Sequence, residues 1–316
     1  MPFNGKSGKF NAAIRTVEIG TGDKAVKLGG ESVLPFYTFD APIENAPKVG
    51  VVISDLALAE MENEVEGIKE YYAGAACFAD LAKKAEAMPG SDFVVLHFEG
   101  ADPNGENKSV EECVAIAKEV GDAITAPLVI EGCKHAEKDA ELFSKVAEAL
   151  QGKNFLILAA KEENYKGVAA AAGLAYDQKV GAESAVDINL AKQLNVLIGQ
   201  MGVDQGKVIM NVGSAAAGYG FEYVVSTMDR IKAAALAQGD AQLQMPIITP
   251  VADDTWGVKE AMASEADMPE WGCREARGVD MEIETAAAVL ASGANAVILK
   301  HPTSVATISK LIKELV

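Results

Sequence analysis

The sequence predicts an α/β fold, a (β/α)8 TIM barrel with an N-terminal β-hairpin extension. Eight short apolar runs recur along the chain, and a helical pattern follows each of them, which is typical of parallel strands that alternate with helices. Their even spacing favours a closed barrel over a doubly wound open sheet. The 316 residues suit one barrel domain over residues 48–316, preceded by a hairpin and an irregular extension over residues 1–47.

The extension comes first along the chain. Residues 13–19 (AIRTVEI) alternate in polarity, residues 20–23 have turn composition, and a shorter run (AVKLGG) follows at residues 25–30. This pattern predicts a hairpin, and we expect it to lie as a lid across one end of the barrel. Three prolines within residues 35–47 indicate an irregular connection to the first barrel strand.

The barrel elements follow in alternation. The predicted strands are residues 49–54, 93–98, 128–131, 155–159, 179–183, 208–212, 247–251 and 296–299, of which the fifth has the weakest pattern. The helical patterns after them are a long amphipathic stretch that ends near residues 88–90, then residues 109–124, 135–150, 165–174, 186–201, 221–237, 281–292 and 305–315. The second pattern begins with a capping box, Ser109 and Glu112.

Composition excludes several classes of function. The formal net charge of −18 repels phosphate backbones and anionic lipid, so neither nucleic acid nor a membrane surface is an expected partner. The acidity suits a basic protein partner, or it serves to keep an abundant protein in solution. Residues 1–10 lack the apolar segment of a signal peptide, and no apolar run approaches the length of a membrane span. We therefore expect a soluble, cytoplasmic protein.

Common cofactor motifs do not occur in the sequence. The four cysteines, at positions 77, 113, 133 and 273, include no CxxC pair, so the usual spacing for zinc or an iron–sulfur cluster is missing. No GxGxxG follows the first strand and no GxxxxGK[ST] is found, which argues against dinucleotide and P-loop sites. HExxH and EF-hand patterns are also absent, so no metal site is predicted.

Polar residues at the carboxyl ends of the strands are the candidates for chemistry, because (β/α)8 barrels place their sites at that face. Each of them is also a candidate helix N-cap or solvated loop residue. After the last strand, Lys300 and His301 suggest a Schiff-base lysine or a proton relay, although a histidine before a proline is more typical of a loop. The full set is Asp55, Glu99, Asp102, Glu131, Lys134, Lys161, Glu183, Asn211, Asp253, Asp254, Lys300 and His301.

Two loops stand out. Residues 213–218, between the sixth strand and a helix that carries Phe221 and Tyr223, are glycine, serine and alanine, so the backbone can approach a flat partner closely. The alternative is that Gly213 and Gly218 only relieve a tight turn. Residues 252–277 after the seventh strand hold both tryptophans, Trp256 and Trp271, each of which would be an interface anchor if exposed or a local plug if covered.

Four segments resemble a known family over the whole chain. They are GSAAAGYGFEYVVSTMDRIKAAA (213–235), ITPVADDTW (248–256), GAESAVDINLAKQLNVLI (181–198) and KFNAAIRTVEIG (9–20). These segments are similar to the small subunit of the corrinoid iron–sulfur protein of acetogens, which is the counterpart of the delta subunit of the archaeal acetyl-CoA decarbonylase/synthase.

The resemblance implies a barrel that pairs, as a heterodimer, with a large corrinoid iron–sulfur subunit. That partner would carry the [4Fe-4S] cluster and a cobalamin domain, and the barrel would cover one face of the corrin. A methyltetrahydrofolate methyltransferase would supply a methyl group, and carbon monoxide dehydrogenase/acetyl-CoA synthase would receive it in the Wood–Ljungdahl pathway. Because the loop of small residues can lie against a flat macrocycle, and Tyr219 and Tyr223 offer hydroxyl groups to its amide side chains, we hypothesise that residues 214–223 contact the corrin. The expected cobalamin-binding residues are Asn211, Gly213, Ser214, Ala215, Ala216, Gly218, Tyr219, Tyr223, Asp253 and Trp256.

Two further hypotheses remain open. The first is a stand-alone enzyme, either like a pterin-dependent methyltransferase or like an aldolase, with Lys161 or Lys300 and the strand-end carboxylates as its machinery. Asn211 and Asp253 would be remnants of a pterin site in that case, but fold analogy alone does not carry a function. The second is a scaffold that binds the large subunit without touching the corrin. In the carrier role, this chain has no catalytic residue of its own.

Overall fold

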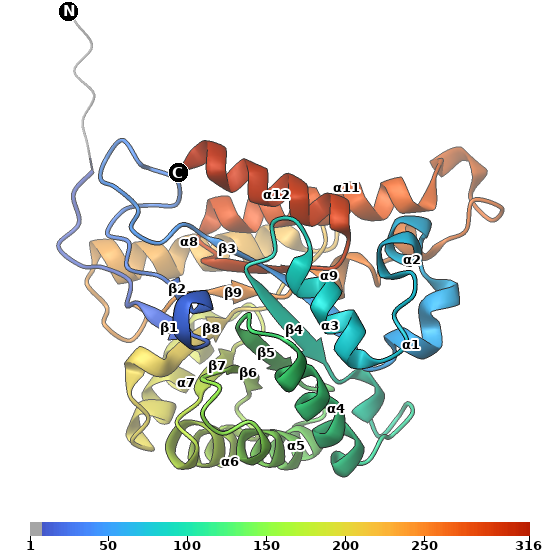
Figure 1. Cartoon of the computed structure of the whole chain (residues 1–316). Coiled ribbons are helices and arrows are strands. Elements are labelled where there is room, and N and C mark those ends of the chain that lie inside the picture. The colour runs from blue at the N-terminus through green and yellow to red at the C-terminus, as the bar shows by residue number, and fades with distance from the viewer. Residues whose placement is uncertain (1–7) are drawn as a thin grey trace, which may run out of the picture.

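Eight parallel strands form the centre of the protein. The computed structural model describes residues 8–316 (Figure 1), and its sheet order is β8-β7-β6-β5-β4-β3-β10-β9. A parallel bridge between Met210 and Ile247 joins the two outer strands, where the Met210 N–H donates to the carbonyl oxygen of Pro246 at 2.8 Å. The sheet therefore closes on itself, and the predicted (β/α)8 barrel is confirmed. The strands are β3 Lys48–Ser54, β4 Phe93–His97, β5 Leu128–Glu131, β6 Leu156–Ala160, β7 Lys179–Glu183, β8 Val208–Asn211, β9 Ile248–Thr249 and β10 Ala296–Leu299.

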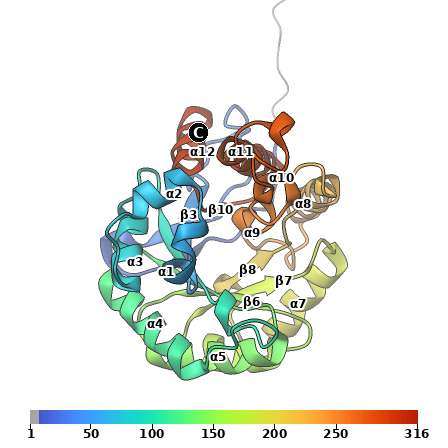
Figure 2. The same cartoon turned by 90° about the vertical axis from the view of Figure 1, so that its right-hand side faces the viewer.

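Helices surround the strands, as Figure 2 shows from the second direction. Their apolar faces pack on the outside of the barrel and make the larger of two hydrophobic clusters. The α-helices are α1 Ala57–Glu60, α2 Glu66–Tyr72, α3 Phe78–Ala87, α4 Val110–Ala123, α5 Ala136–Ala149, α6 Tyr165–Val168, α7 Ile188–Gln200, α8 Phe221–Ala237, α9 Val251–Thr255, α10 Lys259–Met262, α11 Arg274–Ser292 and α12 Pro302–Leu315. A π-helical segment, Ala169–Ala175, continues α6, and the predicted capping box of α4 is present.

Seven of the eight barrel strands have the predicted bounds to within one residue, and the larger differences lie between β9 and α11. The seventh strand was expected over residues 247–251 but spans only Ile248–Thr249, because α9 begins at Val251 directly after Pro250. Val251 is buried in either conformation, so its apolar side chain does not distinguish strand from helix. The expected loop at residues 252–268 contains most of α9 and all of α10, and α11 begins at Arg274 rather than at residue 281.

The N-terminal hairpin closes the amino-terminal end of the barrel. Its strands, β1 Val17–Ile19 and β2 Val26–Leu28, pair antiparallel. Val17, Ile19 and Leu28 are buried in one cluster with the first residues of three barrel strands, Phe93, Leu156 and Ala296. The hairpin is therefore the lid that the sequence predicted, and it lies opposite the face where barrel sites form.

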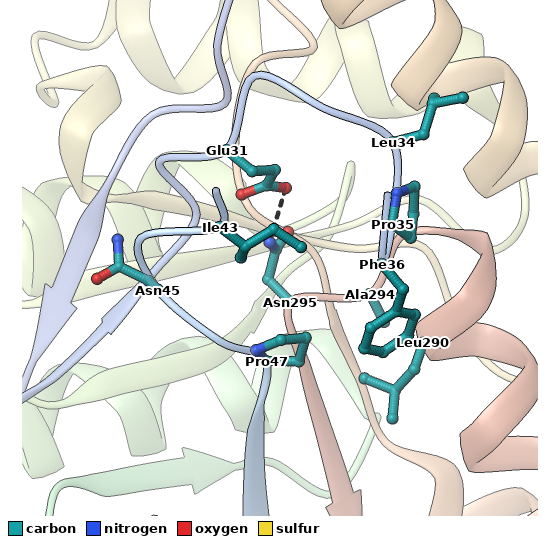
Figure 3. A pocket seen from close by; sticks show the side chains of 11 residues that line it. Glu31, Leu34, Pro35, Phe36, Ile43, Asn45, Pro47, Leu290, Ala294 and Asn295 are labelled. Atoms are coloured by element: carbon teal, nitrogen blue, oxygen red, sulfur yellow. Dashed lines mark hydrogen bonds between the residues drawn. The ribbon is translucent and has the colours of Figure 1, made fainter. Parts of the chain in front are cut away.

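A buried ionic cluster fixes the rest of the N-terminal extension. The Nζ atom of Lys232, on α8, lies 2.7 Å from Oε1 of Glu31, which also accepts a hydrogen bond from Asn295 Nδ2 at 2.8 Å (Figure 3). Burial alone raises the pKa of Glu31, but the Lys232 ammonium and the Asn295 amide more than offset it, so the net pKa lies below its ordinary value. Because neither charge is left unpaired, the extension is held against the barrel.

Among residues 8–316, none of the helices has both the length and the apolar composition that crossing a bilayer requires.

Candidate functional site

Strand register builds a polar ring at the carboxyl end of the barrel. In a parallel sheet, paired residues point to the same face, and every second residue faces the interior. Ser54 pairs with His97, His97 with Glu131, and Glu183 with Asn211. The apolar residues two positions earlier on these strands, such as Val95, Val129 and Ile209, fill the barrel interior. The last inward-facing residues therefore form a polar ring: Ser54, His97, Glu131, Glu183, Asn211 and Lys300.

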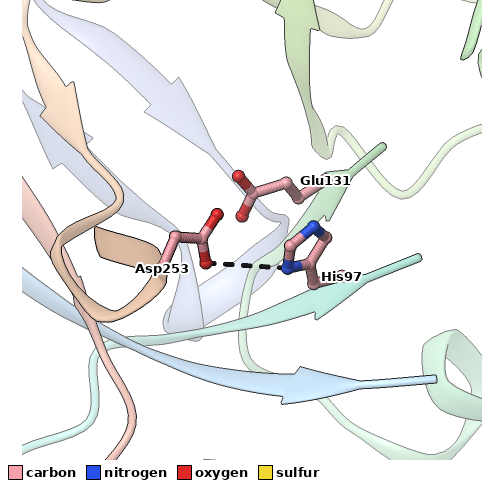
Figure 4. Close-up of side chains that lie close together, drawn as sticks. All are labelled: His97, Glu131 and Asp253. Atoms are coloured by element: carbon pink, nitrogen blue, oxygen red, sulfur yellow. Dashed lines mark ion pairs between the residues drawn. The ribbon is translucent and has the colours of Figure 1, made fainter. Parts of the chain in front are cut away.

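Two members of this ring, His97 and Glu131, lie close to a third side chain, Asp253. His97 ends β4, Glu131 ends β5 and Asp253 lies on α9, and one ligand-type atom from each lies within 4.8 Å of the other two (Figure 4). The Nδ1 atom of His97 is 3.6 Å from Oδ1 of Asp253. The other oxygen of Asp253 binds the Lys134 ammonium at 2.8 Å. We call His97, Glu131 and Asp253 the mouth cluster.

The pKa values of the two carboxyl groups of the mouth cluster are shifted in opposite directions. Glu131 is fully enclosed, and burial together with the negative charge of Asp253 raises its pKa well above the ordinary value. Burial also raises the pKa of Asp253, but nearby His97 and Lys134 reverse the effect, so its net pKa is lowered. Burial raises the pKa of the adjacent Asp254 to about 6. One carboxyl group thus favours its neutral form while its neighbour stays ionised.

A pocket of about 190 Å³ opens onto the mouth cluster from solvent. Side chains from the first two barrel strands and from α9 line it, and Lys300 closes one side. The Lys300 ammonium is 2.6 Å from Oε1 of Glu64. The lining residues are Val52, Ser54, His97, Glu99, Ala252, Asp253, Trp256, Gly257 and Lys300.

The loop of residues 212–220, here called the β8–α8 loop, begins at the polar ring. Asn211 is buried, and its Oδ1 accepts a hydrogen bond from the Gly213 N–H at 2.9 Å. Gly213, Gly218 and Gly220 have φ values of 84°, 88° and 87°, which only glycine adopts without strain. No atom comes within 4 Å of a Cβ added at Gly218, so the space beside it is open. The glycines of this loop therefore allow its turns, and the open space at Gly218 also leaves room for a partner to approach the backbone.

The remaining predicted residues of this loop differ in exposure. Ala216 is buried and Ala215 partly so, whereas Tyr219 is 49% exposed and Tyr223 is 67% exposed. The Tyr219 hydroxyl is 2.6 Å from Oε2 of Glu260, which links this loop to α10. Within the described chain, the buried Oγ of Ser214 has no hydrogen-bond partner. The loop and the first turn of α8 thus offer one exposed aromatic ring each, Tyr219 and Tyr223.

Both tryptophans are partly covered, which matches a local plug rather than an exposed anchor. The Trp256 ring stacks on His301 with centroids 5.9 Å apart and planes 18° apart, and it also fills the space beside Gly278. The His301 Nδ1 accepts from the Thr303 N–H and caps α12. The Trp271 ring lies beneath the Lys259 ammonium, 5.1 Å from its centroid. His301 is therefore a structural residue, as a histidine before proline suggests.

Other strand-end residues are held by local partners. Asp55 is buried, accepts from the Gly100 N–H at 2.8 Å and pairs with Lys108 at 3.2 Å. The Lys161 ammonium lies 3.4 Å from Oε1 of Glu183. Asp102 accepts from the N–H of Asn104 in its own turn. These residues shape the rim of the barrel.

His97 is not among the strand-end candidates that the sequence predicts. Its place is set by period-two alternation, since it follows Val95 by two residues on an inward-facing strand position. Extending the alternation of the predicted strand 93–98 would have found it. Its proximity to Asp253 follows from barrel closure, which no local spacing encodes.

The fold and the polar mouth define a TIM-barrel protein whose functional face is the carboxyl end of the strands. Comparison of the sequence with protein families narrows this class. The chain belongs to the family described as CO dehydrogenase/acetyl-CoA synthase delta subunit, whose model matches residues 16–308. The family resemblance drawn from the sequence is confirmed.

Curated relatives carry the same description. The chain is 32% identical over 300 residues to acetyl-CoA decarbonylase/synthase complex subunit delta 2 of Methanosarcina acetivorans, covering 94% of this chain and 67% of the relative. It is also 32% identical over 316 residues to the delta subunit of Methanothermobacter thermautotrophicus, covering 99% and 77%. These relatives are longer than this chain.

Solved structures support the fold alone. Dihydropteroate synthase from Xanthomonas albilineans, with 4-aminobenzoic acid, superimposes with a TM-score of 0.56 at 12% identity, over 95% of this chain and 98% of the other. The 7,8-dihydropteroate synthase from Vibrio fischeri gives the same TM-score at 11% identity, over 94% and 97%. At such identities a shared architecture does not transfer activity.

Proposed function

We propose that this chain is the small subunit of a heterodimeric, cytoplasmic corrinoid iron–sulfur methyl carrier. In this role its barrel mouth covers a cobalamin held with a large subunit that carries the [4Fe-4S] cluster. Family membership supports the assignment, since the relatives are named as subunits of an acetyl-CoA decarbonylase/synthase complex. The carrier would take a methyl group through a methyltetrahydrofolate methyltransferase and deliver it to carbon monoxide dehydrogenase/acetyl-CoA synthase. Bound cobalamin supplies the cobalt that accepts and donates the methyl group.

The β8–α8 loop is the observation that carries this proposal. A corrin is broad, has flat faces and bears amide side chains at its edge. The open space beside Gly218 admits such a face. Tyr219 and Tyr223 present exposed rings with hydroxyl groups at the same end of the barrel. These features fit the group.

The expected cobalamin-binding residues divide into two roles under this proposal. The exposed or open positions, Gly218, Tyr219 and Tyr223, would contact the macrocycle or its side chains. The covered positions would shape the surface, as Asn211 does by binding the Gly213 N–H. Shape rather than proton transfer is thus what this chain supplies. Gly213, Ser214, Ala215, Ala216, Asp253 and Trp256 complete the proposed set.

An aldolase-like reaction has weaker support from the geometry. Lys161 pairs with Glu183 at 3.4 Å and Lys300 pairs with Glu64 at 2.6 Å. A lysine that forms a Schiff base must leave its carboxylate partner to reach the carbonyl group of a substrate. The two lysines are therefore better suited to fixing the rim than to forming a Schiff base.

The decisive experiment is co-purification of the full chain with its native partners at moderate salt, followed by absorption spectroscopy. We expect the complex to show corrinoid and iron–sulfur bands and the chain alone to be colourless. The variant Tyr219→Ala/Tyr223→Ala should lower the cobalamin retained by the complex roughly tenfold, which corresponds to about 1.4 kcal/mol. Enlarging the loop by Ala215→Leu should act in the same direction.

The matched control is Tyr37→Ala, since Tyr37 is an exposed tyrosine in the N-terminal extension, 43% accessible. It should leave retention unchanged. Full cobalamin retention in the loop variants would overturn the proposed contact. A lone chain with stable catalytic activity and no corrinoid partner would overturn the carrier function itself.

A further inference from the structure

The contact between His97 and Asp253 in the mouth cluster is an ion pair rather than a hydrogen bond. His97 Nδ1 and Asp253 Oδ1 are 3.6 Å apart, beyond the usual 2.7 to 3.2 Å range of an N–H···O hydrogen bond. Both side chains are enclosed, with His97 only 5% exposed. A nitrogen and an oxygen atom held at this separation in a buried place could both bind one ion lying between them.

Glu131 provides independent support. It is 4% exposed, and among the described residues its Oε2 atom has no hydrogen-bond partner. A buried carboxyl oxygen without a partner is costly in either protonation state, because it has lost its hydrogen bonds to water and gained none in exchange. Figure 4 shows the Glu131 carboxyl directed toward Asp253 and His97. The unsatisfied oxygen therefore belongs to the same small volume as the other two donors.

The distances agree with coordination by one metal ion. At metal–ligand bonds of about 2.0 to 2.2 Å, two ligands of a tetrahedral ion are roughly 3.4 Å apart. The separation between His97 and Asp253 already matches this value. All separations in the cluster are within 4.8 Å, so the Glu131 side chain would have to move by at most about 1.4 Å.

The surroundings support ligands of this type. Lys134 holds the outer oxygen of Asp253 at 2.8 Å, which leaves Oδ1 directed at His97. Carboxylates outnumber ammonium groups near the cluster, since Glu99 lies 4.0 Å from His97 and the charges of Glu183 and Asp254 act there too. The adjoining pocket of about 190 Å³ provides an entry path and room for a water ligand.

We propose that His97, Glu131 and Asp253 form a binding site for one divalent transition-metal ion, with an open coordination position toward the pocket. One imidazole and two carboxylates favour Zn²⁺, Co²⁺, Mn²⁺ or Fe²⁺, because Mg²⁺ and Ca²⁺ prefer oxygen ligands alone. Thiolate ligands are not involved, since no cysteine belongs to the cluster. The proposed ion is additional to the corrin cobalt, and although Asp253 also belongs to the proposed cobalamin set, metal binding by this chain does not depend on the carrier role.

The test uses the full chain, stripped with a chelator and titrated with Zn²⁺ in a calorimeter and with Co²⁺ in a spectrophotometer. We expect one ion per chain and visible d–d bands with Co²⁺. The variants His97→Gln and Asp253→Asn should weaken binding at least about 100-fold, because each removes a direct ligand. Circular dichroism checks that both variants fold.

The chain supplies its own controls because it has three histidines. His135 and His301 each cap a helix and neither belongs to the cluster, so His135→Gln and His301→Gln should keep full metal binding. X-ray absorption of the Co²⁺ form should show nitrogen and oxygen ligands only. Absence of stoichiometric binding, unchanged affinity in His97→Gln, or a sulfur ligand would each overturn the proposal, and the X-ray absorption result stands even if a variant does not fold.

Discussion

The Nζ atom of Lys232 lies 2.7 Å from Oε1 of Glu31, and both side chains are almost wholly buried. The pair joins the N-terminal extension to α8, with Asn295 as a shared hydrogen-bond partner. Removing one partner leaves a buried charge, so Lys232→Met should lower the free energy of unfolding by about 3 to 5 kcal/mol. Chemical denaturation measures this. The double variant Glu31→Gln/Lys232→Met should be less destabilised than Lys232→Met, and the reverse order would contradict the explanation.

The same pair predicts a pH dependence. The pKa of Glu31 is lowered on folding, so below its ordinary value of 4.5 the unfolded chain takes up this proton before the folded chain does. The stabilisation is therefore complete above about pH 4.5 and is lost as the pH falls through the folded pKa. Denaturation curves between pH 3 and pH 7 should show this loss, reduced in the double variant. Equal slopes in both proteins would assign it to other carboxyl groups.

Gly278 on α11 should resist substitution although helices usually favour alanine. A Cβ at this position would overlap the Trp256 ring, so Gly278→Ala should displace the ring from His301, lower stability by about 1 to 3 kcal/mol and alter tryptophan fluorescence. Gly199 on α7 is the matched control, because its nearest neighbour is 3.5 Å away. Gly199→Ala should be neutral or stabilising by about 0.5 to 1 kcal/mol.

The capping box of α4 gives a prediction at the surface. Ser109 Oγ accepts from the Glu112 N–H at 3.2 Å, and Glu112 Oε2 accepts from the Ser109 N–H at 2.8 Å. Ser109→Ala should therefore lower the free energy of unfolding by about 1 kcal/mol. The exposed Ser226→Ala on α8 serves as control and should change it by less than about 0.5 kcal/mol. Equal effects would mean that the cap contributes nothing.

Lysine chemistry distinguishes the carrier from an aldolase. Incubation with pyruvate and borohydride should leave Lys161 and Lys300 unmodified, because each ammonium is held by a carboxylate. Peptide mass spectrometry detects any adduct. A stable adduct at either lysine, with the surface Lys310 unmodified, would favour the enzyme hypothesis.

Most of the barrel could be predicted because the local hydrophobic pattern of each strand and helix agrees with its place in the fold. The strands at residues 128–131, 179–183 and 296–299 have the predicted bounds, since an apolar run between polar turns has few other uses. The errors cluster around β9, where Pro250 ends the strand and a buried Val251 fits a helix equally well. The early start of α11 was missed because Gly278 resembles a helix breaker until Trp256 is seen beside it.

The site was less predictable than the fold. Glu131 and Asp253 were identified as strand-end candidates, but their meeting with His97 depends on β4, β5 and α9 converging at one mouth. The β8–α8 loop was singled out from composition, whereas the burial of Ala216 and the exposure of Tyr223 depend on tertiary packing. The local sequence indicates which residues are candidates for the site, and the closure of the barrel determines which of them lie in contact.

The hairpin of β1 and β2 leaves the barrel open at one end only. Its buried side chains close the amino-terminal end, and the apolar side chains of the interior leave no passage through the centre. Whatever enters at the polar ring must leave by the same opening. If a large cofactor covers that opening, the order of arrival and departure is fixed, because the last group to settle on the rim must be the first to move away.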